Sequence, residues 1–137
     1  MRGTVLLLDG HASRAMYAEH FRANGFVVYE AEHSEEALRY FDSLVPDVVI
    51  AVLGAHNGPS VISDLSARVD RAASIIVVSE IADCERARQA GADSFLLASE
   101  PPGGLVYEIS RALILRRSGR RLPWNRRDTT ASQRPRP

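Results

Sequence analysis

Five short, strongly apolar segments alternate with amphipathic segments, and this alternation constrains the fold more than any other feature of the chain. The apolar segments are rich in Val, Ile and Leu and show no alternation with polar residues, as expected of parallel strands buried on both faces. The segments between them carry apolar residues at helical spacing. We therefore expect an α/β domain with a flavodoxin-like (βα)5 architecture, a doubly wound parallel sheet of strand order 2-1-3-4-5. The predicted strands are Thr4–Leu8, Phe26–Ala31, Asp47–Leu53, Ser74–Ser79 and Ser94–Ala98, and the predicted helices are Ser13–Asn24, Ser34–Leu44, Ser60–Arg71, Ala82–Ala90 and Leu105–Leu115.

Local signals mark the ends of these segments. Ser13 and Ser34 are placed to cap the first two helices, since a hydroxyl oxygen there can accept a backbone N–H that has no partner within the helix. Gly25 and Gly91 follow helices at the position that favours glycine. The four residues 101–104, Pro-Pro-Gly-Gly, predict a turn before the last helix.

Charge divides the chain into two parts that cancel each other. The chain has 17 Arg, no Lys and 17 acidic residues, so its formal net charge is zero. Residues 1–115 hold 9 Arg and 16 acids, whereas residues 116–137 hold 8 Arg and a single acid, Asp128. The basic segment is also rich in Pro and has no periodic apolar face. We therefore expect one folded domain over residues 1–116 and a disordered Arg/Pro-rich tail over residues 117–137, which is too short to be a separate DNA-binding domain.

Composition and missing motifs exclude several classes of protein. No apolar run approaches the length of about 18 residues needed to span a membrane. One cysteine, Cys84, allows no internal disulfide and no cysteine-rich zinc site, so we expect a reduced, cytoplasmic protein and interpret Cys84 as a small side chain. No hydrolase triad, phosphate-binding loop or glycine-rich dinucleotide turn is present, so we expect neither an enzyme nor a bound cofactor.

In a doubly wound sheet, function is expected beyond the carboxyl ends of the central strands. In this chain those positions are residues 9–11, residues 52–57, and Ser79 with Glu80. Four strings that contain or adjoin them, in this order and spacing, resemble the receiver domains of bacterial response regulators, and the likeness runs from about Thr4 to Arg116. The strings are VLLLDGH, PDVVIAVLG, SIIVVSE and GADSFLLASEP.

The resemblance implies a specific chemistry in two-component signal transduction. A receiver takes a phosphoryl group from a histidine kinase, or within a phosphorelay, onto an aspartate that ends the third strand. Two acids after the first strand help that aspartate to hold Mg²⁺, because a hard cation needs several oxygen ligands. A hydroxyl after the fourth strand and a Lys after the fifth contact the phosphoryl oxygens and offset their charge.

Three of the positions that carry this chemistry have changed in this chain. Gly10 stands where the second acid is expected, Val52 at the phosphoacceptor and Ala98 at the Lys. An isopropyl group can neither accept a phosphoryl group nor bind a metal, and one remaining carboxylate would hold Mg²⁺ only weakly. The pattern therefore predicts a degenerate pseudo-receiver that works without phosphorylation and without a metal.

Three other positions keep the receiver pattern. Asp9 matches the first acid, Ser79 the hydroxyl and Phe95 the aromatic residue that reports the switch. Ser79 can also be read as a cap of the turn that follows it. Asp9 is the one carboxylate left in this pocket, so a phosphorelay receiver with Asp9 as an unorthodox acceptor is the first alternative.

A second alternative is a small-ligand site in the same crevice. Residues 9–11, Asp-Gly-His, resemble the Asp-x-His signature of cobalamin-binding domains, in which the His binds cobalt and the Asp orients it. Arg14 and residues 52–54 do not fit the rest of that signature. His11 and His56 could also meet above the sheet beside Asp9, as ligands of a transition metal, although two solvated loop histidines are the simpler interpretation.

The resemblance also implies a binding surface for proteins. Receivers form dimers and dock partners through the fourth helix, fifth strand and fifth helix, which here cover Ala82–Ala90, Phe95–Ala98 and Leu105–Leu115. We expect a protein partner, or a second copy in a homodimer, on this face. For the basic tail three roles stay open: contact with an acidic protein, contact with a nucleic acid through Arg and Trp124, or a solvated extension.

Overall fold

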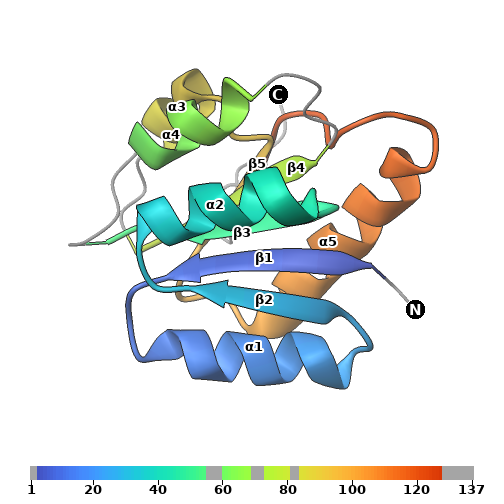
Figure 1. Ribbon diagram of the computed structural model, residues 1–137. Helices are drawn as coiled ribbons and strands as arrows, with labels where there is room; N and C mark the ends of the chain where they lie inside the picture. Colours follow the sequence, from blue (N-terminus) through green and yellow to red (C-terminus); the bar gives the residue numbers. More distant parts are fainter. Residues whose placement is uncertain (1–2, 55–59, 69–72, 81–83, 128–137) are drawn as a thin grey trace, which may run out of the picture.

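The computed structural model describes residues 3–54, 60–68, 73–80 and 84–127, and it forms a six-stranded parallel sheet covered by helices on both faces (Figure 1). The strand order is β2-β1-β3-β4-β5-β6, so the predicted order 2-1-3-4-5 and the flavodoxin-like fold are confirmed and one strand is added. Each of the five expected strands agrees with its prediction to within one residue at either end. The elements in chain order are β1 (Thr4–Asp9), α1 (Ser13–Ala23), β2 (Val27–Ala31), α2 (Ser34–Leu44), β3 (Val48–Val52), α3 (Ser60–Ser66), β4 (Ser74–Ser79), α4 (Cys84–Ala90), β5 (Ser94–Leu97), α5 (Pro102–Arg116) and β6 (Asn125–Arg127).

Two apolar layers hold the sheet between the helices. Along β1, Val5 and Leu7 face the layer built with α1 and α5, whereas Leu6 and Leu8 face the layer built with α2, α3 and α4. All four side chains are at most 1% exposed. Each such side chain stabilises the fold by about 1.5–3 kcal/mol through burial alone. Burial on both faces explains why the strand sequences are continuously apolar.

The predicted serine caps are wrong. Helix α1 has Ala12 at its N-cap and α2 has His33, and neither residue makes a side-chain capping bond. Ser13 and Ser34 are instead the first residues of their helices. The hydroxyl of Ser13 instead donates to a carboxylate oxygen of Asp9, the last residue of the preceding strand, and a hydrogen bond to a charged acceptor is stronger than one between neutral groups.

The predicted turn at residues 101–104 is also wrong, because α5 already begins at Pro102. Proline is tolerated in the first helical turn, where its missing N–H would have no partner within the helix. The helix α3 ends at Ser66, earlier than predicted, whereas α4 is helical over every described residue of its predicted range, and Ala82 lies outside the described residues. No helix in the ranges described above is long and apolar enough to cross a membrane.

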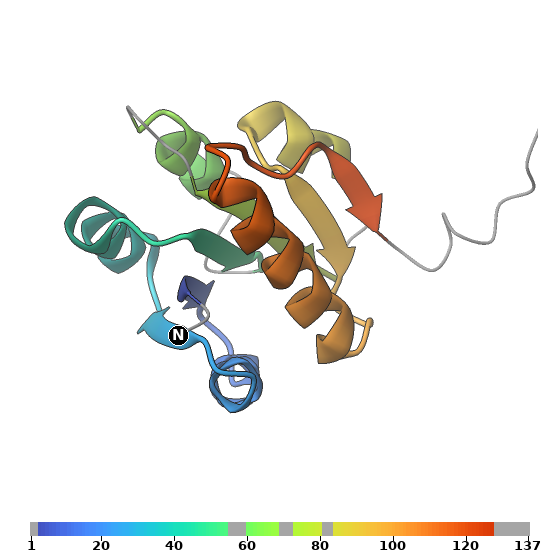
Figure 2. The same ribbon diagram turned by 90° about the vertical axis from the view of Figure 1, so that its right-hand side faces the viewer.

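The structure differs from the expectation of a disordered tail at residues 122–127. Leu122 is only 3% exposed, and β6 pairs in parallel with β5, placing Ser94 opposite Asn125 and Leu96 opposite Arg127. Figure 2 shows β6 beside β5 at the edge of the sheet. Two large apolar residues, Leu122 and Trp124, lie among the arginines of this segment. The composition of the whole tail, which is rich in Arg and Pro, does not reveal them. Residues 128–137 lie outside the described residues.

Candidate functional site at the carboxyl end of the sheet

The central strands bring the predicted pocket residues together. Asp9 ends β1 and pairs in register with Val52, the last residue of β3, which in turn pairs with Val78 of β4. Asp9 is fully buried, and Val52 and Ser79 are 5% and 8% exposed. Parallel strands that end at one edge of a sheet thus place a carboxylate directly beside an isopropyl group.

Nearby donors occupy both oxygens of the Asp9 carboxylate. Its Oδ1 accepts the backbone N–H of His11 at 2.8 Å and lies 3.0 Å from Nδ1 of the same residue. Its Oδ2 accepts the hydroxyl of Ser13 at 2.6 Å. A buried carboxylate needs such partners to offset the loss of water. Residues 11 and 13 therefore supply hydrogen-bond partners to both oxygens of this buried carboxylate.

The imidazole of His11 reaches across to the segment after β3. Gly54 lies so close to it that a Cβ on Gly54 would come within 2.5 Å of Nε2. Real side chains do not approach one another so closely, so the absence of a Cβ at Gly54 lets the ring take this position. The structure thus brings the expected pair Asp9 and His11 together. His56, the other predicted ligand, lies outside the described residues.

The remaining pocket positions carry little polar chemistry. Val52 belongs to the apolar layer of α1 and α5, and Ala98 packs against the same layer. The backbone N–H of Ala98 donates to the carbonyl of Ser79 at 2.8 Å, which joins the segments after β4 and β5. Phe95 is 1% exposed and belongs to the opposite layer, with α2, α3 and α4. Gly10 is half-buried between Asp9 and His11.

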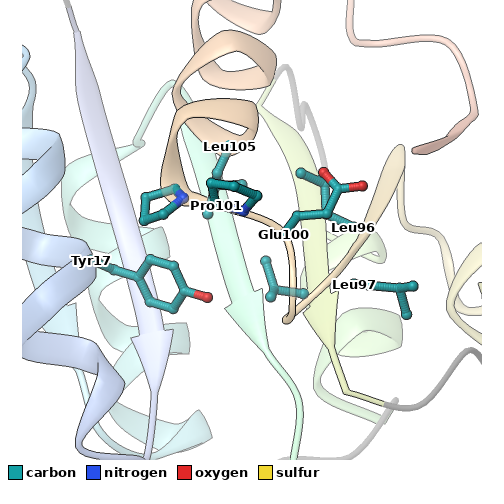
Figure 3. Close-up of a pocket in the computed structure, with 8 residues that line it drawn as sticks. Tyr17, Leu96, Leu97, Glu100, Pro101 and Leu105 are labelled. Carbon is teal, nitrogen blue, oxygen red and sulfur yellow. The ribbon is translucent and has the colours of Figure 1, made fainter. Parts of the chain in front are cut away.

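A small hollow opens beside this cluster, between α1 and the start of α5 (Figure 3). The space inside it is about 10 Å³, room for about one water molecule, whereas ordinary small-molecule sites span roughly 300–1,000 Å³. Tyr17 points its hydroxyl into it. Burial raises the pKa of Tyr17, and the negative charge of Asp9 raises it further, so this phenol stays protonated at neutral pH. The lining residues are Tyr17, Val78, Leu96, Leu97, Glu100, Pro101, Pro102 and Leu105.

Sequence reasoning missed Tyr17 as a pocket residue. Tyr17 and Phe21 are four residues apart in a predicted helix, a spacing that indicates core packing, and their rings do stack at a centroid distance of 6.0 Å. No motif in the sequence indicates that the hydroxyl of Tyr17 lines a hollow. Among the residues described above, no group of three or more His, Cys, Asp or Glu is placed to hold a metal ion.

Comparison with known proteins rests on structure alone, because no protein-family model and no curated protein matches the sequence. A two-component response regulator of the LuxR family from Aurantimonas sp. SI85-9A1 is 26% identical, with a TM-score of 0.76 over 97% of this chain and 94% of that one. A CheY-like receiver domain protein from Methanospirillum hungatei JF-1 is 18% identical, with a TM-score of 0.77 over 86% and 98%. A receiver domain protein from Clostridium thermocellum is 19% identical, with a TM-score of 0.75 over 84% and 97%.

The chain has the fold of a response-regulator receiver domain. The likeness covers nearly the whole of each of these three structures. A receiver fold supports a role in two-component signalling. The receiver roles of the pocket positions stay predictions. These positions are Asp9, Gly10, Val52, Ser79, Phe95 and Ala98.

The carboxyl end of this sheet holds few polar side chains. The side chain of Val52 packs in the apolar layer, and Ala98 packs against the same layer. The one carboxylate, Asp9, is buried and bonded to its own loop. What this pocket offers a ligand is the outer face of the His11 imidazole, whose side chain is 40% exposed.

Proposed function

We propose that this receiver acts as a phosphorylation-independent protein-interaction module in two-component signal transduction, without enzymatic activity. The observation that carries the proposal is the pairing of Asp9 with Val52 at the ends of β1 and β3. A phosphoryl group needs an oxygen nucleophile at that point, and Val52 supplies only carbon. A cytoplasmic location, expected from the single cysteine, is part of the same proposal.

The state of Asp9 supports the proposal over a phosphorelay that uses Asp9 itself. Attack on a phosphoryl donor requires a carboxylate oxygen that the donor can reach. Asp9 is fully buried, and both of its oxygens are bonded to His11 or Ser13. To serve as acceptor it would have to break these bonds and leave the core.

The partner surface in this proposal is the face formed by α4, β5 and α5. Two large apolar side chains of α5 are exposed to solvent, Tyr107 at 55% and Ile114 at 63%. They are seven residues apart and so lie on one side of the helix. We propose that a protein partner docks on this face, and a homodimer is the form to test first. A separate role of the basic tail in binding an acidic protein or a nucleic acid would show as binding that weakens steeply with salt.

A thermal unfolding experiment tests the proposal. The protein is heated with Mg²⁺ alone, with Mg²⁺ plus beryllium fluoride, and without additives, beside a receiver that keeps its acceptor aspartate. Beryllium fluoride mimics an aspartyl phosphate, so a working acceptor pocket must be stabilised when it binds. We expect no shift for this chain and a clear upward shift for the control. An upward shift here, or an acid-labile adduct after incubation with acetyl phosphate, would contradict the proposal.

A small-ligand site is the second candidate, and one observation favours it. Asp9 holds Nδ1 of His11 at 3.0 Å, the arrangement by which a carboxylate orients a metal-binding histidine. The other ring nitrogen, Nε2, lies close to Gly54. A cobalt ion or another metal could bind this nitrogen only if Gly54 or the ring moved. A change in the visible absorbance of cobalamin on mixing with the protein, lost in His11→Ala, would establish this candidate, and an unchanged spectrum would remove cobalamin from it.

A further inference from the structure

Residues 122–127 join the sheet at the surface on which the proposed function depends. The strand β6 lies along β5, so β5 is an internal strand rather than the edge of the sheet (Figure 2). An uncovered edge strand presents unpaired backbone N–H and C=O groups, which readily take up another chain. This chain covers the edge of β5 with its own C-terminal segment.

Two side chains anchor this segment, one on each face of the sheet. Leu122 is 3% exposed and packs in the layer of α1 and α5, and its backbone N–H donates to the hydroxyl of Ser74 at 2.9 Å. Trp124 packs against the opposite layer, and the guanidinium of Arg88 on α4 lies 5.9 Å from the centre of its ring. The segment therefore packs against both faces of the sheet at its edge, just before it pairs with β5.

The connection to the rest of the chain is built so that the segment can leave. Every residue of the link 117–121 is exposed. The strand it leads to is only three residues long, from Asn125 to Arg127. Its attachment thus depends mainly on Leu122, Trp124 and a short ladder of backbone hydrogen bonds, and its loss would leave the five βα units and their two apolar layers in place.

We propose that residues 122–127 are a strand ligand bound in cis to β5, which closes the β5 edge of the partner face until the segment leaves. This inference rests on the proposed function, because the gated surface is the face of α4, β5 and α5. It also states what the β5 edge recognises: an extended segment that runs parallel to β5 and carries an aliphatic residue followed, two positions later, by an aromatic one. A binding partner gains the backbone edge of β5 only by displacing this segment.

The experiment uses the full chain and a fluorescein-labelled peptide with the sequence of residues 117–137. Leu122→Asp places a charge in the apolar layer and should release the segment. The labelled peptide then binds the variant at least about tenfold more tightly than it binds the native chain, because its apparent affinity scales with the fraction of molecules whose edge is open. Binding is measured by fluorescence anisotropy. The same peptide carrying Leu122→Asp should bind neither protein.

Tryptophan emission gives an independent readout, since Trp124 is the single tryptophan of the chain. It should shift to longer wavelength in Leu122→Asp, when the ring becomes exposed to water. The matched control is Leu44→Asp, the same change at a position that is 38% exposed at the end of α2, and it should behave like the native chain in both measurements. Circular dichroism confirms that each variant is folded.

Two results would overturn the inference: a folded Leu122→Asp variant that does not bind the peptide, or a native chain that binds it equally well. If Leu122→Asp does not fold, Trp124→Ser opens the edge from the other face and is tested with the same labelled peptide. The beryllium fluoride experiment reports on the ends of β1 and β3 rather than on the pairing of β5 with β6, and it uses a different readout. The two proposals can therefore fail separately. Stabilisation by beryllium fluoride would contradict the proposed function alone, and failure of the peptide to bind Leu122→Asp would contradict the strand ligand alone.

Discussion

Asp9 and Val52 stand opposite each other at the ends of β1 and β3, so this domain pairs a fully buried carboxylate with an aliphatic side chain. The carboxylate survives in the core because His11 and Ser13 donate to both of its oxygens. What remains at this edge of the sheet is a local structural unit of residues 9–13. Its stability can be tested directly.

Replacing the aliphatic partner should expose the cost of a second charge. In Val52→Asp, two carboxylates meet in a buried site without a cation, so we expect the free energy of unfolding at pH 7 to fall by about 2–4 kcal/mol. Mg²⁺ should recover part of this loss, because the two carboxylates together can hold it. Urea denaturation with and without Mg²⁺ measures both effects. Val52→Ala is the control and should lose stability with no response to Mg²⁺, and equal stability of Val52→Asp and the native chain would refute the prediction.

Because the His11 ring lies against Gly54, substitutions at these two positions, which are 43 residues apart in the sequence, should affect stability non-additively. A methyl group in Gly54→Ala meets the imidazole and forces it to move, which should weaken the bond from His11 to Asp9. We expect a loss of about 1–2 kcal/mol in the native background and almost none in His11→Ala. A double-mutant cycle by chemical denaturation measures the difference, and equal losses in the two backgrounds would show that the ring does not fill this space.

Tyr17 should make the protein sensitive to alkali. Burial, and then the charge of Asp9, raise its pKa above the ordinary 10.0, so above pH 10.0 the unfolded chain loses this proton before the folded chain does. The stabilisation is complete below that pH and is lost as the pH rises towards the pKa of the folded state. Unfolding free energies at pH 9–11 should fall more steeply in the native chain than in Tyr17→Phe. Tyr107→Phe, at an exposed tyrosine, should follow the native curve, and parallel curves for all three proteins would contradict the assignment.

A buried glutamate in α5 should be far more sensitive than an exposed one in α4. Glu108 is fully buried and accepts from the hydroxyl of Ser94 at 2.9 Å and from Arg111 at 2.8 Å. Glu108→Gln should cost about 2 kcal/mol, since it weakens charge-assisted bonds that no water replaces. The pair of Glu85 and Arg88 has the same spacing on an exposed surface, and Glu85→Gln should cost less than about 0.5 kcal/mol. Similar losses in the two variants, measured by urea denaturation, would disprove the contrast.

The sheet was predictable because burial on both faces leaves a direct mark on each strand. A mostly apolar segment such as residues 74–79 fits few structures other than a buried strand. The rule for right-handed crossovers then supplies the strand order. Asp9 and Val52 could likewise be placed together, since both end central strands. These inferences use only local composition and a general rule of topology.

The remaining features depend on contacts that leave no periodic pattern. The strand β6 is three residues long and follows an arginine-rich link, so neither strand alternation nor a long apolar run announces it. The packing of His11 on Gly54 joins two loops whose separation in sequence says nothing about their distance. Ser13 could be recognised as a helix start, but whether its hydroxyl serves as a cap or donates to Asp9 depends on the exact angle between β1 and α1.

The sixth strand also decides where the polypeptide leaves the domain. A chain that stopped at the end of α5 would finish at the amino end of the sheet, on the side where β1 begins. Because β6 runs parallel to β5, Arg127 is instead delivered to the carboxyl edge, where Asp9 and Val52 lie. A fluorescent protein or affinity tag joined directly after Arg127 would therefore be tethered from the same edge as the pocket, and fusions intended to leave that edge accessible belong before Thr4.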